Sequence, residues 1–295
     1  MKILALDIGG TAIKIGIINE KGEILESKEI PTLAKEGGEA LMNRILNIIE
    51  QYKDIDRIGI SSAGQIEHIE GKVIYANENL PGWTGMRIKR RIEEAFNIKT
   101  VVENDVNAAA IGEAYYGAAK EDKSFLCLAY GTGIGGAIVE QGEIYRGSLG
   151  SAGEFGHIIT HVGGNNCPCG GKGCYEAYAS TSALVNRVKK EFAIENIDGR
   201  TIFRLLEQKN EVIKTIVDDW LFEITIGLVN LVHIFNPSCI VLGGGIMAQP
   251  YAITYIRESL YKHIMPNYQN VRIVNAKLGN NAGILGAAHL AMEMN

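Results

Sequence analysis

The sequence has no excess of positive charge and no long apolar run, and each absence excludes a class of protein. The formal net charge is −5 and the pI is near 5.8, whereas proteins that grip nucleic-acid backbones present a basic face. We therefore expect no nucleic-acid partner. Asp7 follows only six residues, too soon for a signal peptide, and no uncharged stretch reaches the roughly 18 residues of a membrane helix. We expect no membrane partner and a cytoplasmic protein.

A P-loop, the motif Gly-x-x-x-x-Gly-Lys followed by Ser or Thr, is also missing from the sequence, which excludes that class of nucleotide-binding enzyme. No low-complexity segment or flexible linker occurs. Glycine, in contrast, is abundant. It makes up 35 of the 295 residues, or about 12%, against a usual share of about 7%. Glycine serves tight turns and the close approach of backbone to a ligand. The 295 residues exceed one ordinary domain of about 100–200, so we expect two lobes.

The two halves of the chain begin in the same way. An apolar strand at residues 2–6 delivers the sequence Asp-Ile-Gly-Gly-Thr, and a second at 124–129 delivers Gly-Thr-Gly-Ile-Gly-Gly. Each loop is followed by another strand. Gly16 to Ile24 then matches Gly136 to Ile144 at six of nine positions, and the shared context favours duplication over chance.

Two related lobes with a cleft between them follow from this repeat. We assign residues 1–118 to a smaller α/β lobe, completed by a C-terminal helix at about 283–295. We expect residues 119–282 to form a larger α/β lobe that carries a cysteine-rich loop. The larger lobe also holds a mostly helical stretch from about 180 to 235.

The glycine loops are candidate phosphate-binding segments. The string Gly131-x-Gly133-x-x-Gly136 fits the dinucleotide fingerprint, but that motif requires a helix to begin at the loop, and here a strand is expected. Simple hairpin turns are the other alternative. A pair of equivalent loops, with a third glycine run at 243–245, favours backbone N–H groups that close around phosphate oxygens. Asp7 stands where it could hold magnesium directly or through water.

The segment Glu103-Asn104-Asp105 is a candidate catalytic segment because it precedes an alanine-rich helix that Gly117 closes. An aspartate at a helix N-terminus is fixed in place and, we expect, stays ionised, ready to accept a hydroxyl proton. Phosphoryl transfer needs mainly positioning and charge neutralisation, so a carboxylate of low basicity suffices. The alternative interpretation is that Asp105 is only an N-cap.

A cluster of metal-ligand residues follows. His157 comes shortly before Cys167, Cys169 and Cys174, and three thiolates with one imidazole suit a tetrahedral zinc. With four protein ligands the zinc would be structural. A disulfide, which a reducing cytoplasm disfavours, and free thiols are the alternatives. We expect His161 to be a spare imidazole on the surface.

Taken together, these motifs resemble the ROK family of sugar kinases and related repressors, within the actin-like, ribonuclease-H-like ATPase superfamily. The resemblance covers essentially the whole chain. It rests on the ordered motifs at residues 7–11, 103–105, 131–136, 154–157, 167–176 and 243–245. It implies a two-lobed actin-like fold with a duplicated core and a central cleft, and members are typically homodimers or homotetramers.

The resemblance also implies roles for individual residues. Asp105 would be the general base that activates a sugar hydroxyl, commonly the 6-hydroxyl. The residues implied to bind sugar hydroxyls are Asn79, Asn104, Asp105, Glu154, His157 and Glu176. Those implied to bind ATP are Asp7, Gly9, Gly10, Thr11, Gly131, Thr132, Gly133, Gly135, Gly243, Gly244 and Gly245. The resemblance thus implies that the lobe at 119–282 carries most of the adenosine site. The zinc ligands would be His157, Cys167, Cys169 and Cys174.

The predicted function is therefore ATP- and Mg²⁺-dependent phosphorylation of a hexose, with glucose as the first candidate. The segment Ser61-Ser-Ala-Gly64 departs from the proline of many family glucokinases and looks closer to N-acetylmannosamine kinases, as does the run from Lys277 to Gly283. Another hexose or a β-glucoside is a further alternative. A sugar-responsive repressor is a remote alternative. Such repressors carry an N-terminal helix-turn-helix, whereas only six residues precede Asp7 here. A sugar-binding pseudokinase would not need Asp105.

Overall fold

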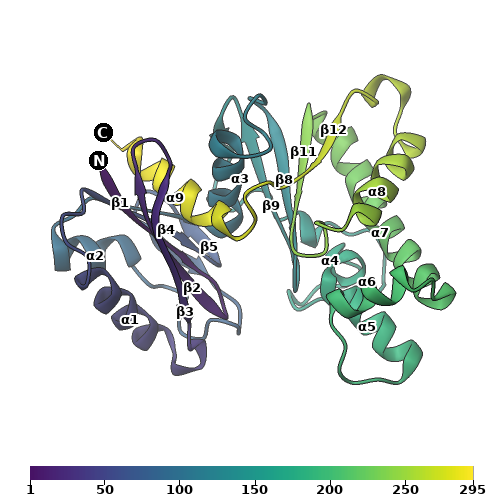
Figure 1. The fold of residues 1–295 in the computed structure, drawn as a ribbon, viewed down its shortest axis with the longest axis horizontal. Helices are drawn as coiled ribbons and strands as arrows, with labels where there is room; N and C mark the ends of the chain where they lie inside the picture. The colour runs from purple at the N-terminus through teal and green to yellow at the C-terminus, as the bar shows by residue number, and fades with distance from the viewer. Residues whose placement is uncertain (295) are drawn as a thin grey trace. The chain divides into compact units, whose positions relative to one another are not determined.

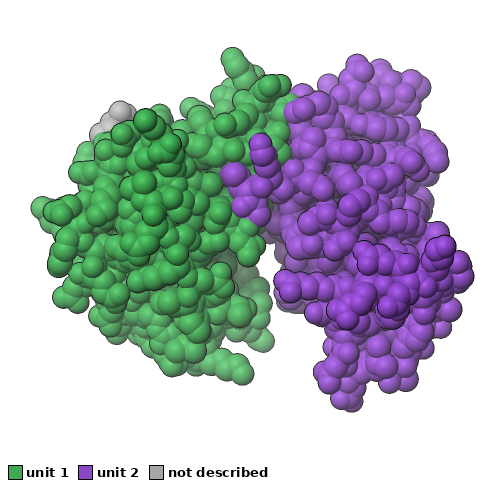
Figure 2. Space-filling model, in the orientation of Figure 1, with its two compact units in different colours: residues 1–123, 138–152, 280–295 green, residues 124–137, 153–279 purple. Residues whose placement is uncertain are grey.

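The computed structural model describes residues 1–294 and divides the chain into two compact units. Unit 1 comprises residues 1–123, 138–152 and the C-terminal residues from Asn280, and unit 2 comprises residues 124–137 and 153–279 (Figure 2). The predicted domain boundaries stay a prediction, and the last residue of the predicted C-terminal helix, Asn295, lies outside the described residues. Among residues 1–294, no helix combines the length and apolarity needed to cross a bilayer.

A five-stranded mixed sheet organises unit 1, in the order β3-β2-β1-β4-β7 (Figure 1). Strand β1 pairs antiparallel with β2 and parallel with β4. A separate hairpin, β5–β6, lies beyond β4 in the chain. The strands of this unit are β1 (Lys2–Ile8), β2 (Ala12–Asn19), β3 (Ile24–Pro31), β4 (Arg57–Ser62), β5 (Gln65–Glu67), β6 (Lys72–Tyr75) and β7 (Thr100–Asn104).

Helices cover both faces of this sheet. Side chains alternate across a strand, so Leu4 and Leu6 join the core beneath α1 (Gly38–Glu50) and α2 (Ile88–Phe96). The opposite face receives α9 (Ala282–Met292), against which α3 (Asp105–Tyr116) packs (Figure 1). Helix α2 begins at Ile88 because Arg87, the residue before it, has a non-helical backbone.

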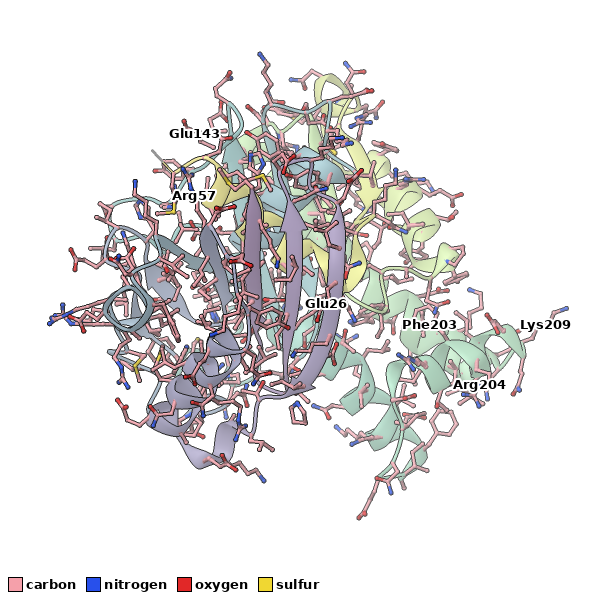
Figure 3. The ribbon with its side chains drawn as sticks, turned by 60° about the vertical axis from the view of Figure 1, so that its left-hand side comes forward. Glu26, Arg57, Glu143, Phe203, Arg204 and Lys209 are labelled. Carbon is pink, nitrogen blue, oxygen red and sulfur yellow. The ribbon has the colours of Figure 1, made fainter. Side chains whose placement is uncertain are left out.

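The contact between α3 and α9 is close because glycine stands at the crossing. A Cβ added at Gly286 would lie 1.6 Å from the carbonyl oxygen of Ala108, and one at Gly112 would lie 2.4 Å from that of Ala282. At the other end of α9, Arg57, labelled in Figure 3, donates from Nη1 to the carbonyls of Ala291 and Met292, both at 2.9 Å. The sheet and both helices are thereby fixed as one body.

The second sheet repeats the strand order of the first, as β10-β9-β8-β11-β12. Its core strand β8 pairs parallel with β11, which pairs parallel with β12, as β1, β4 and β7 do in unit 1. The strands are β8 (Phe125–Tyr130), β9 (Ile134–Glu140), β10 (Glu143–Ile144), β11 (Cys239–Gly243) and β12 (Arg272–Asn275). The duplicated core that the sequence match predicted is confirmed by this shared order.

The predicted helical stretch from 180 to 235 contains three helices, and two more helices flank it in the chain. Asp198 and Asn210 cap two of them, each accepting a backbone N–H with its side chain. The five helices are α4 (Glu176–Ala179), α5 (Thr181–Phe192), α6 (Gly199–Glu207), α7 (Glu211–Phe235) and α8 (Pro250–His263).

Replacing Gly286 by alanine tests the helix crossing. Alanine normally favours a helix over glycine by about 1 kcal/mol, but here the added methyl group would meet the Ala108 carbonyl, and overpacking costs about 1–3 kcal/mol. We expect Gly286→Ala to lower the melting temperature by about 4 °C or more. Gly245→Ala is the control, because nothing lies within 4 Å of a Cβ added there. A G286A protein as stable as the wild type would contradict this packing.

Candidate functional site

The residues predicted to form the site fall into two groups, one in each unit, and each group is described by itself. In unit 1, Asp7 lies at the end of β1 and Asp105 opens α3. Ser61, on the neighbouring strand β4, donates to Asp7 Oδ1 at 2.5 Å. The carboxyl ends of parallel strands β1, β4 and β7 thus bring together the polar residues of this unit, as expected for a ligand site of an α/β sheet.

Asp105 is held by its neighbours through one oxygen atom. Oδ1 accepts from the backbone N–H of Val106 at 3.0 Å and from Asn104 Nδ2 at 2.8 Å. Neither bond involves Oδ2. The side chain is partly exposed, so Oδ2 is the atom free to take a proton.

The helix cap is Asn104 rather than Asp105. Its Oδ1 accepts from the N–H groups of Val106 and Asn107, while Nδ2 donates to Gly64 O and Asp105 Oδ1. This arrangement excludes the alternative in which Asp105 serves only as an N-cap. It also uses the whole hydrogen-bonding capacity of the Asn104 amide within the chain. A direct bond from Asn104 to a sugar would have to replace one of these bonds, and it stays a prediction.

The expectation that Asp105 stays ionised with low basicity is wrong. Burial raises the pKa of Asp105 to about 7, and the negative charge of Asp7 adds to the rise, outweighing the bonds from Val106 and Asn104 that lower it. The pKa of Asp7 is itself raised by burial, although the Ser61 hydroxyl opposes that shift. Desolvation and a like charge therefore exceed the effect of the helix N-terminus. A carboxylate with a pKa near neutrality is suited to accept and release protons.

The first glycine loop is a tight turn between β1 and β2. Gly9 N–H donates to Ala12 O at 3.0 Å, and Thr32 Oγ1 donates to Gly9 O at 2.6 Å. Gly10 and Thr11 are exposed. Asn79 lies against Gly10, with its Cβ 3.6 Å from where a Cβ of Gly10 would stand. The turn therefore presents backbone and hydroxyl groups to solvent, with Asn79 beside it.

In unit 2 the second glycine loop is the equivalent turn between β8 and β9. Strand β9 begins at Ile134, so Gly135 lies in a strand and no helix follows the loop. The dinucleotide alternative is thereby excluded. The turn is anchored by Thr181, whose N–H donates to Gly131 O at 3.0 Å. Gly131, Thr132 and Gly133 form its tip.

The third glycine run ends β11. Gly244 has a φ of +107°, and a Cβ added to it would lie 2.1 Å from the carbonyl oxygen of Tyr130. Only glycine fits this approach of the turn to the end of β8. The run at 243–245 and the loop at 131–133 therefore lie at the ends of neighbouring parallel strands.

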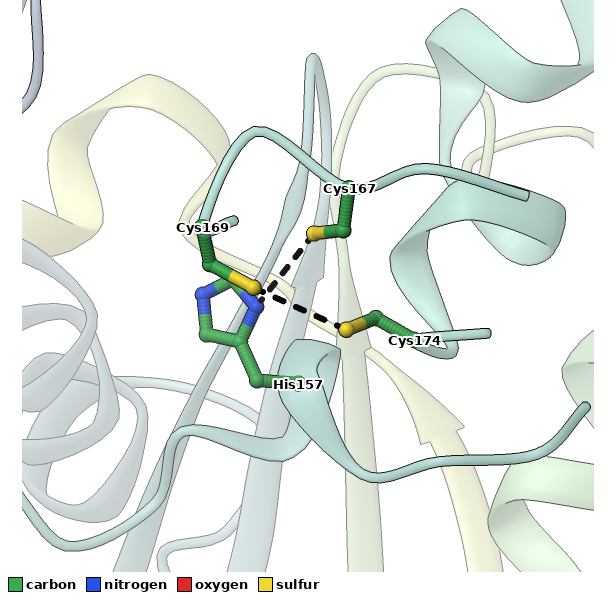
Figure 4. Close-up of side chains that lie close together, drawn as sticks. All are labelled: His157, Cys167, Cys169 and Cys174. Atoms are coloured by element: carbon green, nitrogen blue, oxygen red, sulfur yellow. Dashed lines mark hydrogen bonds between the residues drawn. The ribbon is translucent and has the colours of Figure 1, made fainter. Parts of the chain in front are cut away.

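Four side chains predicted to bind zinc converge in unit 2 (Figure 4). Their ligand atoms lie within 4.8 Å of one another. Cys169 Sγ is 3.7 Å from Cys174 Sγ, and Cys167 Sγ is 3.7 Å from His157 Nδ1. A tetrahedral zinc with Zn–S bonds near 2.3 Å separates its sulfur ligands by about 3.8 Å. The four residues therefore fit a structural zinc, and all five cysteines of the chain are free of disulfides.

Glu176 connects this cluster to the second glycine loop. Its Oε1 accepts from Cys167 Sγ at 3.1 Å and lies 3.8 Å from His157 Nδ1, while Oε2 accepts from Ile134 N–H at 3.2 Å. Glu154 Oε2 lies 3.9 Å from Nε2 of the same imidazole. Glu154, His157 and Glu176 are thus grouped beside the cysteines.

His161 is more than a spare surface imidazole. Its ring is 40% exposed, but it stacks on Tyr178 with centroids 3.8 Å apart and its Nε2 lies 3.7 Å from Glu223 Oε2. The residue attaches the cysteine-rich loop to α7. This attachment could not be predicted from the local sequence, because Glu223 is 62 positions from His161.

The repeated sheet and the grouped acidic, glycine and metal-ligand residues define a two-lobed α/β protein of the actin-like ATPase fold. Comparison with known proteins narrows the class. The chain belongs to the ROK family, which it matches over residues 3–294.

Its relatives include enzymes and a regulator. A glucokinase of Streptomyces coelicolor is 33% identical over 312 residues, covering 98% of this chain and 97% of that protein. A β-glucoside kinase of Listeria monocytogenes is 32% identical over 304 residues, covering 100% and 99%. A proposed xylose repressor of Caldicellulosiruptor is 30% identical over 314 residues, covering 99% of this chain but 78% of the repressor.

Solved structures agree with the fold over the whole chain. A ROK hexokinase of Thermus thermophilus has a TM-score of 0.86 at 34% identity, covering 99% and 98% of the two chains. A ROK glucokinase of Streptomyces griseus in complex with glucose and AMPPNP has a TM-score of 0.86 at 30% identity, covering 100% of both. A proposed N-acetylmannosamine kinase of Listeria monocytogenes has a TM-score of 0.90 at 28% identity, covering 99% of both. The predicted family and fold class are confirmed.

Removal of one thiolate tests the zinc site. We expect Cys169→Ala to lose bound zinc and to lower the melting temperature by several degrees, because a structural metal contributes directly to folding. His161→Asn is the control for zinc content alone, because His161 is a nearby imidazole outside the ligand set. Elemental analysis of both proteins provides the measurement. A C169A protein that keeps its melting temperature, together with a wild type that holds no zinc, would defeat the assignment.

The raised pKa of Asp105 predicts a stability that depends on pH. The pKa of Asp105 is about 7 in the folded state and about 3.9 in the unfolded state, so the folded state binds the proton more tightly. The free energy of unfolding therefore falls as pH rises from about 4 through 7. Asp105→Asn should therefore stabilise the protein more at pH 8 than at pH 5, by at most about 1.4 kcal/mol per pH unit. Denaturant unfolding at each pH measures this, with the exposed Asp54→Asn as control. Equal effects of D105N at both pH values would contradict the shift.

Proposed function

We propose that the chain is an ATP-dependent hexose kinase that phosphorylates its sugar at the 6-hydroxyl, with glucose the first candidate. The observation that carries the proposal is the Asp105 carboxyl, bonded through Oδ1 and open at Oδ2, with a pKa of about 7. Membership of a family that includes glucokinases and other sugar kinases supports it.

Asp105 Oδ2 is the proposed proton acceptor. The sugar oxygen loses its proton to Oδ2 as it bonds to the γ-phosphorus of ATP, and the bond from that phosphorus to the β–γ bridging oxygen breaks to release ADP. Asn104 and Val106 fix the orientation of the carboxyl through Oδ1. A carboxyl with a pKa of about 7 can both accept a proton and release it near neutral pH.

The proposed phosphate ligands are the two glycine turns, with Gly243 to Gly245 beside the adenosine. Backbone N–H groups of the exposed turns, with the hydroxyls of Thr11 and Thr132, would donate to phosphate oxygens. Asp7 would hold Mg²⁺ directly or through water, and its partly buried carboxyl, bonded to Ser61, suits an oxygen-preferring ion. When bound, Mg²⁺ neutralises charge on the transferred phosphoryl group.

The sugar would be recognised by Glu154, His157 and Glu176, with Asn79 and Asn104 as further candidates. His157 would bind zinc through Nδ1, which faces Cys167 Sγ, and present Nε2 to a hydroxyl. A structural Zn²⁺ held by the four converging ligands would fix the imidazole and the neighbouring carboxylates. Charged acceptors in fixed positions discriminate well among sugars that differ in one hydroxyl.

The alternative substrate is N-acetylmannosamine, or another hexose or β-glucoside. It is favoured by the buried serines 61 and 62, where many family glucokinases carry a proline. Ser61 bonds to Asp7, and Ser62 Oγ accepts from Trp83 Nε1 at 3.1 Å. Both hydroxyls are therefore occupied within the protein. The segment continues to Gly64, whose carbonyl accepts from Asn104 Nδ2 at 2.9 Å.

Coupled measurement of ADP release tests the proposal directly. Purified protein with Mg²⁺ and ATP is screened against glucose, mannose, fructose, N-acetylmannosamine, N-acetylglucosamine and a β-glucoside. We expect sugar-dependent release with at least one, and a loss of about 10²- to 10⁴-fold in Asp105→Asn, because the base is removed. Calorimetry should show that the variant still binds the sugar.

Three outcomes discriminate among the alternatives. Undiminished turnover in D105N would overturn the role of Asp105. Sugar binding without any ADP release in the wild type would instead indicate a sugar-responsive regulator, as the repressor relative allows. Release of ADP with N-acetylmannosamine alone would select that substrate. The dimeric or tetrameric state stays a prediction, which light scattering of the same sample checks.

A further inference from the structure

Glu103 is a carboxylate with only 1% of its surface exposed, one residue before the cap of α3. Its charge is compensated by Arg146, whose Nε and Nη2 both donate to Oε2, at 2.9 and 2.7 Å. Taking an ion pair out of water costs free energy that its attraction does not always recover. A buried pair at this position therefore calls for a reason beyond stability.

The other oxygen of Glu103 holds the start of α3. Oε1 accepts from the backbone N–H of Asn104 at 2.9 Å and from Asn107 Nδ2 at 3.0 Å. Asn104 in turn bonds Asp105 Oδ1. The position of the proposed base thus depends on Glu103 through two successive hydrogen bonds.

Arg146 holds a loop as well as the carboxylate. Its carbonyl accepts from Ala152 N–H at 3.0 Å, which closes residues 147–151 into a compact loop. Gly150 in that loop has a φ of +83° and stands so close to Ile66 that an added Cβ would lie 2.9 Å from its carbonyl oxygen. The loop therefore contacts β5 through Gly150 and is bound to Glu103 through Arg146. Along the chain it leads to Glu154.

His68 is a further titratable group beside this pair. Burial and the charge of Arg146 lower its pKa, although Glu103 and Glu67 oppose the shift. A neutral imidazole does not compete with Arg146 for the carboxylate. Lysine could not replace Arg146, since a single ammonium lacks the guanidinium fork that places two donors on one oxygen.

We propose that the Glu103–Arg146 pair is a positioning device that sets Asp105 and the loop at residues 146–152 relative to each other, and that this loop forms part of the sugar site. The proposal rests on the proposed kinase function. Phosphoryl transfer depends on placement, and an error of about 1 Å can cost 10²-fold in rate. Glu103 and Arg146 touch no reacting atom, so they position rather than catalyse.

The test compares Arg146→Lys and Glu103→Gln with a matched control, Arg91→Lys. Arg91 also pairs with a glutamate of unit 1, Glu39, at 2.9 Å, but at the surface on α2. We expect both test variants to lower kcat by about 10- to 100-fold and to raise the KM for sugar, while the KM for ATP changes less than about twofold. R91K should leave all three constants unchanged.

Hydrogen exchange without substrates supplies a readout that does not depend on turnover. In R146K and E103Q, the amides of residues 104–107 and of residues 147–152 should both exchange faster, while those of β8 and β11 keep their wild-type rates. Kinase constants equal to the wild type in both variants would overturn the proposal. So would faster exchange confined to one of the two segments, even if the protein phosphorylates none of the sugars tested.

A general loss of stability is a separate outcome. Variants that melt earlier but keep kcat and both KM values per folded molecule would show a merely structural pair and overturn the proposal. If Glu103→Gln fails to fold, Arg146→Lys, which keeps the charge, carries the test alone. Failure of the proposed function appears as no turnover in the wild type, whereas failure of the positioning role appears as uncoupled exchange of the two segments.

Discussion

The carboxyl of Asp105 lies at the start of α3 in surroundings that resist its charge, and much of unit 1 contributes to that placement. Strand β7 delivers the residue, Asn104 caps the helix and bonds Oδ1, and the nearby Asp7 raises the pKa further. An aspartate whose pKa is raised to about 7 in the folded state lowers the stability of the folded protein at physiological pH. Such a cost is typical of groups retained for chemistry rather than for folding.

The rest of the fold makes this placement rigid. Gly286 and Gly112 allow α9 and α3 to approach until backbone meets backbone, and Arg57 fastens the far end of α9 to β4. The helix that carries Asp105 therefore cannot shift without moving the sheet. In unit 2, the cysteine cluster gives comparable support to His157, and Glu176 joins it to the glycine turn at Ile134.

Much of this could be predicted from local sequence. The internal match between the segments that begin at Gly16 and Gly136 predicted a duplicated core, and the two sheets share one strand order. The spacing of His157 and the three cysteines predicted that these side chains converge. Both signals lie in short stretches of chain, where the pattern itself determines which residues can meet. Strand β9, which follows the second glycine loop, could be predicted for the same reason.

Properties set by distant residues could not be predicted in this way. The ionisation of Asp105 was expected from its helix alone, but burial and Asp7, 98 positions away, reverse the sign of the shift. Arg146 lies 43 positions from Glu103, and His161 lies 62 positions from Glu223. A carboxylate in a buried strand signals that a cation must be near, yet the sequence does not say which.

One measurement tests the central claim that Asp105 directs phosphoryl transfer to a hexose. The wild-type protein is incubated with Mg²⁺, ATP and glucose, and the product is identified by proton–phosphorus correlation NMR. A phosphorus signal coupled to the two protons on carbon 6, absent from the Asp105→Asn reaction, is the predicted result. A phosphate on another carbon, or the same product from both proteins, would contradict it.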